Sequence, residues 1–111
     1  MDGEVFSRIL TGELAHADGR VVYRLTGDLD SAVADAVRDR LAELVDSASG
    51  GLIVLDLSEL RFIDSRGVRA LLQIHDQARG GGGTLVLFRP NPHLRKILDL
   101  LELGAVFSIE P

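Results

Sequence analysis

The apolar positions of this chain fall into strand-like and helix-like stretches along most of its length. Residues 1–10 show no clear period, and we expect them to form a loosely held arm before one domain over residues 11–111. Residues 11–17 predict a short edge strand, and the Asp18-Gly19 pair after it is a signal for a two-residue hairpin turn. Residues 20–26 alternate apolar and polar side chains and predict the strand that completes this hairpin.

A helix is expected after the short turn Gly-Asp-Leu-Asp at residues 27–30. Its apolar side chains recur three or four positions apart, which is the spacing of one helical face, and it is expected to end near Val45. Asp30 and Ser31 are the two candidates for its N-terminal cap, because short polar side chains accept hydrogen bonds from the first helical amides. The apolar face consists of Val33, Val37, Leu41 and Leu44.

Two more helices are expected in the second half of the chain. One runs over residues 65–79 with Asp64 as its cap, and it ends at the glycine run 80–83, where a left-handed exit is expected. The other begins with a cap and a first-turn proline at Asn91-Pro92 and closes at Gly104. The apolar faces are Val68, Leu71, Leu72 and either His75 or Ala78 in the first, and Leu94, Ile97, Leu98 and Leu101 in the second.

Strands separate these helices. Residues 52–57 form a nearly continuous apolar run, typical of a central strand covered on both faces, and residues 84–88 and 106–109 predict a further strand and a last edge strand. The resulting order, β-β-α-β-α-β-α-β, predicts the α/β class, with a mixed sheet and helices mainly on one face. Cover for the second face of residues 52–57 is expected from a partner or from the arm over residues 1–10.

Composition narrows the class of protein. The chain has 111 residues, of which 46% are hydrophobic and 26% charged, as in one soluble globular domain. It has no cysteine, which excludes disulfides and thiolate–metal sites and is typical of a reducing compartment. Its net charge of −5 argues against direct nucleic-acid binding, and no apolar run is long enough to cross a membrane. We therefore expect a cytoplasmic protein with no metal ion or cofactor.

The candidate chemistry lies where residues 52–57 lead into the second helix. Ser65 directly follows the expected cap Asp64, so its hydroxyl lies at a helix start, where the first amides lack internal partners and the helix dipole favours negative charge. A phosphate on Ser65 would meet free amides there and be tolerated by the fold, with Asp64 and Asp30 forming an acidic patch beside it. The residues alone also fit an ordinary serine at a helix start.

A hydrolase mechanism would need Ser65 beside a histidine, and the sequence does not favour one. The G-x-S-x-G elbow is absent around Ser65, and His75 falls about three turns along the same helix, too far from the hydroxyl. The glycine run 80–83 lacks the Lys-Ser/Thr ending of a phosphate loop and precedes a strand. We expect a binding protein without enzymatic activity. The three histidines are His16, His75 and His93.

The segment LIVLDLSELRFIDSRGVRALL, residues 52–72, resembles the signature of STAS domains, particularly those of bacterial anti-sigma factor antagonists. The GDLD turn, the glycine-rich loop and the proline that starts the last helix agree, and the resemblance spans residues 11–109. It implies a STAS-like fold and an antagonist that binds an anti-sigma factor, itself a serine kinase, and so frees a sigma factor. It further implies that this kinase phosphorylates Ser65, that the modified protein no longer binds, and that a serine phosphatase restores it.

The same resemblance implies the residues that bind the partner. Arg66 departs from the family, whose members commonly have Ser or Thr after the phosphorylated serine, and its guanidinium is expected to pair with the phosphate or to alter the choice of kinase.

The alternative role is a STAS domain that acts as a scaffold or accessory unit in a larger signalling or transporter assembly. A monomer or a weak dimer is expected. The implied partner-binding residues are Asp30, Ser31, Asp64, Ser65, Arg66, Gly67 and Arg69.

Overall fold

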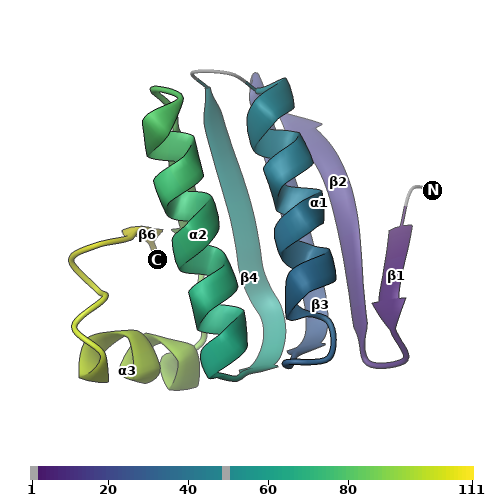
Figure 1. Cartoon of the computed structure of the whole chain (residues 1–111), viewed down its shortest axis with the longest axis vertical. Helices are drawn as coiled ribbons and strands as arrows, with labels where there is room; N and C mark the ends of the chain where they lie inside the picture. The colour runs from purple at the N-terminus through teal and green to yellow at the C-terminus, as the bar shows by residue number, and fades with distance from the viewer. Residues whose placement is uncertain (1–2, 49–50) are drawn as a thin grey trace.

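The computed structural model describes residues 3–48 and 51–111, which form one six-stranded sheet with its strands side by side in chain order (Figure 1). Strands β1 to β3 pair antiparallel and β3 to β6 pair parallel, so the predicted mixed sheet is confirmed. The strands are β1 (Gly3–Ser7), β2 (Leu10–Ala17), β3 (Arg20–Leu29), β4 (Leu52–Ile63), β5 (Thr84–Phe88) and β6 (Ser108–Glu110).

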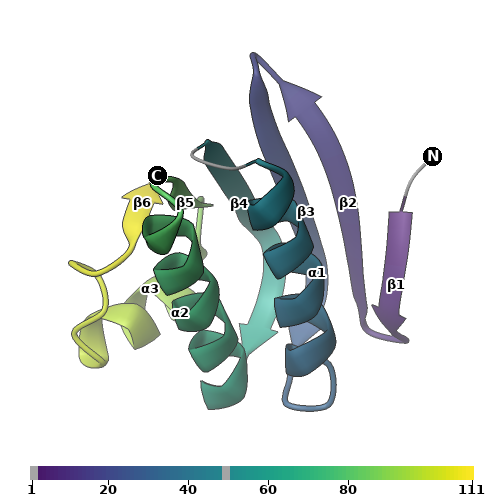
Figure 2. The same ribbon diagram turned by 45° about the horizontal axis from the view of Figure 1, so that its top comes forward.

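Three helices in the described residues connect the parallel strands: α1 (Ala34–Ser47), α2 (Ser65–Gly80) and α3 (Pro92–Leu100). α1 and α2 lie side by side over one face of the sheet, and α3 lies on the β6 side of α2 (Figures 1 and 2). The α/β class with helices mainly on one face is therefore confirmed. Within residues 3–48 and 51–111, no helix is long and apolar enough to cross a membrane.

The core fills the space between the helices and the sheet. Each leucine that moves fully out of water contributes about 1.5–3 kcal/mol by transfer alone, and all three helices supply such side chains. This shared core fixes the helices against the sheet and thereby positions the loops at the carboxyl ends of the strands. Its fully buried members include Leu10, Tyr23, Leu25, Leu41, Leu55, Leu71, Leu87 and Leu98.

The first ten residues contain a strand that the apolar pattern does not predict. β1 pairs antiparallel with β2 and forms the edge of the sheet, so β2 is an inner strand and the prediction that it is an edge strand is wrong. The pattern misses β1 because this short strand has few apolar side chains, Val5 and Phe6, and they do not alternate. The division into an arm over residues 1–10 and a domain over residues 11–111 stays a prediction.

The side chain of Glu4 ties β1 to the rest of the fold. Its carboxylate accepts a hydrogen bond from the hydroxyl of the buried Tyr23. Arg40 of α1 places its Nε 2.9 Å from both carboxylate oxygens and its Nη2 2.8 Å from Oε2. The hydrogen bond from Arg40 is the main cause that lowers the pKa of Glu4. Burial, followed by the contact with Glu4, raises the pKa of Tyr23, so its hydroxyl stays protonated and donates.

β3 and β4 run further than the apolar pattern predicts. Residues 27–30, expected to form a turn, belong to β3 as far as Leu29, and β4 continues beside it to Ile63. Register shifts interrupt the pairing of the two strands in this part. Gly27 has a φ of +115°, and a Cβ atom there would lie 1.8 Å from the carbonyl oxygen of Ile9. These irregularities break the two-residue period, which is why the sequence pattern ends both strands too early.

α1 begins later than predicted. Val33 occupies the N-cap position, and no side chain bonds the first helical amides. The Asp30 carboxylate instead accepts a hydrogen bond from the amide of Ala32 at 3.1 Å, and its carbonyl accepts one from the amide of Val33 at 3.2 Å. Asp30 therefore closes a turn before the helix, an arrangement in which a short side chain bonds its own neighbouring backbone. The prediction that Asp30 or Ser31 caps the helix is wrong.

Side chains on neighbouring strands cover the second face of β4. Val54 and Asp56 point away from the helices and are nevertheless buried. Val54 lies in register between Val22 of β3 and Val86 of β5, and Arg24 pairs with the carboxylate of Asp56 at 3.2 Å. β1 lies at the edge of the sheet, so the prediction that the N-terminal arm supplies this cover is wrong.

The expected ends of α2 and the start of α3 are confirmed. Asp64 caps the start of α2. In the glycine run after the end of α2, Gly82 adopts a left-handed φ of +81°. The Asn91 side chain caps α3 by accepting a hydrogen bond from the amide of Leu94 at 2.8 Å. The last strand, expected over residues 106–109, is displaced toward the C-terminus as β6.

α3 is shorter than its apolar stripe suggests. It ends at Leu100, and Glu102 then adopts a left-handed φ of +59°, which ends the helical hydrogen bonding before Gly104. The side chain of Leu101 is exposed, so the last member of the stripe does not face the core as predicted. The buried members of the stripe are Leu94 and Leu98.

The packing of α3 can be tested with Leu98→Ala. Leu98 is fully buried, and its truncation should lower the free energy of unfolding by about 2–5 kcal/mol, because lost contacts leave a cavity. Leu100→Ala is the control, since that side chain is 73% exposed, and it should change the free energy by less than about 0.5 kcal/mol. Equal effects of the two variants in urea unfolding would contradict the described packing.

The attachment of β1 can be tested with Glu4→Gln, which keeps an acceptor for Tyr23 and removes the charge. The partly exposed ion pair with Arg40 should contribute about 1 kcal/mol at neutral pH. Because folding lowers the pKa of Glu4, this contribution should be present at pH 7 and be lost as the pH falls below about 4. Urea unfolding along a descending pH series should show the two proteins converge in acid.

Glu43→Gln is the matched control, since Glu43 lies 3.7 Å from Arg40 and its side chain is 71% exposed. It should leave the free energy of unfolding nearly unchanged at every pH. A difference between the wild type and Glu4→Gln that stays constant down to pH 3 would show that charge pairing is not what attaches β1.

Candidate functional site at the start of helix α2

The predicted site residues lie at one end of the sheet. β3 and β4 are parallel neighbours, so their carboxyl ends lie at the same end of the sheet, where α1 and α2 begin (Figure 1). Asp30 and Ser31 follow β3, and Asp64 and Ser65 follow β4. The fold therefore brings together two segments that lie more than thirty positions apart in the sequence.

The carboxylate of Asp64 joins the two segments. Its Oδ1 accepts a hydrogen bond from the amide of Gly67 at 3.0 Å, within the first turn of α2. Its Oδ2 accepts one from the amide of Ser31 at 2.7 Å, in the loop before α1. Desolvation raises the pKa of Asp64, but these amide bonds and smaller contributions from the Ser31 side chain and the Arg66 amide outweigh it, so the pKa is lowered overall. Asp64 is thus a charged acceptor that holds both helix starts.

This arrangement corrects the expectation that a phosphate on Ser65 would meet free amides. The amide of Gly67 already donates to Asp64, and that of Arg66 helps to stabilise the same carboxylate. A phosphate on Ser65 would therefore compete with Asp64 for these donors.

Gly67 lets α2 approach the ends of the strands closely. A Cβ atom on Gly67 would lie 2.6 Å from Cγ1 of Ile63 and 3.0 Å from the carbonyl oxygen of Leu29. Gly67 is buried, so its part in the site is to keep α2 close to β3 and β4. Any larger side chain would push the helix start, and Ser65 with it, away from the sheet.

The remaining predicted residues differ in what they offer to the surface. Ser31, Ser65, Arg66 and Arg69 are exposed, and the Ser31 side chain also helps to stabilise the carboxylate of Asp64. The carboxylate of Asp30 is directed at the Ala32 amide of its own loop at 3.1 Å. The surface at this end therefore combines two serine hydroxyls with two arginine side chains.

Two features of this end are not predicted from the sequence. Arg61 of β4 pairs with Asp28 of β3, with Nη2 and Oδ1 3.3 Å apart. Phe62 is 45% exposed although it is a large apolar side chain. The apolar pattern gives no signal for either, because both lie where β4 continues beyond Leu57: Phe62 pairs with Asp28 of β3, and Arg61 lies at the register shift between the two strands.

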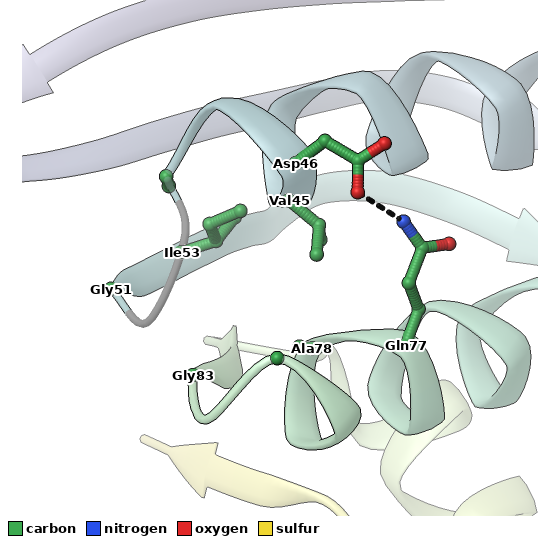
Figure 3. Close-up of a pocket in the computed structure, with 9 residues that line it drawn as sticks. Val45, Asp46, Gly51, Ile53, Gln77, Ala78 and Gly83 are labelled. Atoms are coloured by element: carbon green, nitrogen blue, oxygen red, sulfur yellow. Dashed lines mark hydrogen bonds between the residues drawn. The ribbon is translucent and has the colours of Figure 1, made fainter.

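Two further features lie away from Ser65. His75 is buried and packs edge-on against Phe107, with ring centroids 5.4 Å apart, so it faces the core and not the Ser65 hydroxyl. A cavity of about 100 Å³ lies at the opposite end of α1 and α2. There Gln77 Nε2 donates to Asp46 Oδ1 at 3.0 Å (Figure 3). Neither feature contributes to the surface at Ser65.

Known proteins share this fold. The family model of the STAS domain matches residues 13–111. The chain is 31% identical over 97 residues to the anti-sigma F factor antagonist of Paenibacillus polymyxa, which covers 87% of this chain and 83% of that protein. It is 34% identical over 92 residues to the putative anti-sigma factor antagonist BtrV of Bordetella bronchiseptica, which covers 83% and 78%. The structure of the Bacillus cell fate determinant SpoIIAA in the phosphorylated form matches with a TM-score of 0.68 and 25% identity, over 90% of this chain and 91% of that one. This chain belongs to the STAS domain family.

Proposed function

We propose that this chain is an anti-sigma factor antagonist, a binding module that captures an anti-sigma factor and so frees a sigma factor. Its partner is an anti-sigma factor that is also a serine kinase, which phosphorylates Ser65 and thereby ends the interaction. A serine phosphatase reverses the modification. These partners belong to the bacterial cytoplasm, and the chain acts there without contacting DNA itself.

One observation carries this proposal. Ser65 is exposed at the first position of α2, directly after an aspartate that fixes this helix start to the loop before α1. A kinase can reach the hydroxyl without unfolding the helix, because the helical hydrogen bonds involve the backbone. The similarity to proteins named anti-sigma factor antagonists supports the same role.

The proposed partner surface includes both segments at this end. Ser31, Ser65, Arg66 and Arg69 present polar groups to the partner, while Asp30, Asp64 and Gly67 hold the backbone beneath them. A phosphate adds a charge of about −1.5 to −2 at the centre of this surface. Each ~1.4 kcal/mol of lost interface energy lowers affinity tenfold, so a local change of charge suffices to release the partner.

The switch can be tested with two substitutions at Ser65. Ser65→Ala should bind the kinase as the wild type does and should resist inactivation by ATP. Ser65→Asp should bind at least tenfold more weakly, because its charge lies in the surface that the partner covers. It should nevertheless keep its melting temperature, since a helix start favours negative charge by about 0.3–1 kcal/mol. Affinity for the kinase and thermal melting are the two measurements.

Ser31→Ala is the matched control, because Ser31 is an exposed serine on the adjoining loop. It should still accept phosphate at Ser65 when incubated with candidate anti-sigma kinases and ATP. Phosphate mapped to Ser31 or Ser58, or unchanged affinity of a folded Ser65→Asp protein, would refute the proposed switch. Purification of the chain within a membrane or multi-subunit assembly that lacks such a kinase would favour the scaffold role instead.

A further inference from the structure

We propose that a phosphate on Ser65 pairs with the guanidinium of Arg69, one turn further along α2, and withdraws that side chain from the partner surface. The pairing requires a phosphate on Ser65, and in this respect it rests on the proposed function. The pairing itself follows from the arrangement of donors around Ser65.

Two backbone donors near Ser65 already serve the carboxylate of Asp64. At many helix starts a phosphate binds the first backbone amides. Here the carboxylate of Asp64 accepts a hydrogen bond from the amide of Gly67 at 3.0 Å and is further stabilised by the amide of Arg66. Asp64 is also held from the other side by the amide of Ser31 at 2.7 Å, so it is not readily displaced. These amides already serve Asp64, so a cationic side chain is the source of counter-charge that remains for the phosphate.

The geometry of the helix decides which arginine a phosphate on Ser65 can reach. Successive residues of a helix are rotated by about 100°, so the residue at i+4 lies about 40° from residue i, one turn further along. Such i, i+4 pairs are neighbours on a helix surface, whereas i, i+1 pairs do not face each other. Arg69 is at i+4 from Ser65 and Arg66 is at i+1. Ser65 and Arg69 are both exposed, while Gly67 and Val68 between them turn inward.

Arg66 and Arg69 differ in their ion pairing from most other arginines of the inner strands and helices. Most other arginines of the inner strands and helices are paired: Arg24 with Asp56, Arg40 with Glu4, Arg61 with Asp28. In the part of the chain that the structure describes, neither Arg66 nor Arg69 forms an ion pair with a carboxylate. Before modification, Arg69 is thus available to an acidic group of the partner. After modification, the phosphate competes for the same guanidinium.

The pairing can be measured without any kinase. Phosphoserine is incorporated at position 65 during synthesis of the full chain, and its ionisation is followed by ³¹P NMR from pH 8 to pH 4.5. The second ionisation of phosphoserine lies near pH 6, and a paired guanidinium lowers it. Arg69→Gln should raise the titration midpoint by about 0.3 relative to the otherwise unchanged phosphoprotein. Arg66→Gln, which removes the same charge at the neighbouring position, should raise it by less than half as much.

An equal or larger effect of Arg66→Gln, or no effect of Arg69→Gln in a protein with an unchanged melting temperature, would overturn the pairing. This outcome does not depend on whether a kinase modifies Ser65, so it is distinguishable from failure of the proposed function. With the kinase that does modify Ser65, unphosphorylated Arg69→Gln should bind at least threefold more weakly than the wild type. Wild-type affinity of that variant would show that Arg69 is not withdrawn from the partner.

Discussion

The carboxylate of Asp64 is the interaction on which the site depends. It accepts one amide from the first turn of α2 and one from the loop before α1, so a single side chain fixes two helix starts to the ends of two parallel strands. The amide of the buried Gly67 would be left without this acceptor if the carboxylate were replaced by an apolar group, and an unsatisfied buried donor costs about 1–3 kcal/mol. The absence of a side chain at Gly67 also keeps the start of α2 close to the strand ends, because α2 there lies against Ile63 and Leu29.

This rigid base explains why the proposed switch does not need a change of fold. Ser65 lies on the outer side of a helix start whose inner side is packed and hydrogen-bonded. A phosphate added there changes the charge and shape of the surface, while the backbone beneath keeps its acceptor in Asp64. The state of the switch is then read by a partner that covers this surface and not through a movement of the distant β1 edge or of α3.

Much of the fold follows from local pattern, and the parts that do not follow depend on contacts between distant residues. The alternation of strands and helices, the Asp64 cap and the Asn91 cap are local signals, and they are confirmed. The start of α1 is not predicted because the turn at Asp30 wins over a helix cap. β1 is not predicted because Glu4 is held by Tyr23 and Arg40, far along the chain. The engagement of Asp64 by Ser31, 33 positions away, is equally invisible in the sequence.

The distribution of charge at this end of the molecule gives the proposed switch its direction. The chain has a net charge of −5, yet the residues exposed at the start of α2 are the uncharged Ser65 and the cations Arg66 and Arg69. Two positive charges on an otherwise acidic protein attract a partner surface of opposite sign and raise the rate of encounter. A phosphate of charge −1.5 to −2 nearly cancels them. Modification then offsets the attraction that the two exposed guanidinium groups exert on an acidic partner, next to the carboxylates of Asp64 and Asp30, and this loss is greatest at low ionic strength, where exposed charges are least screened.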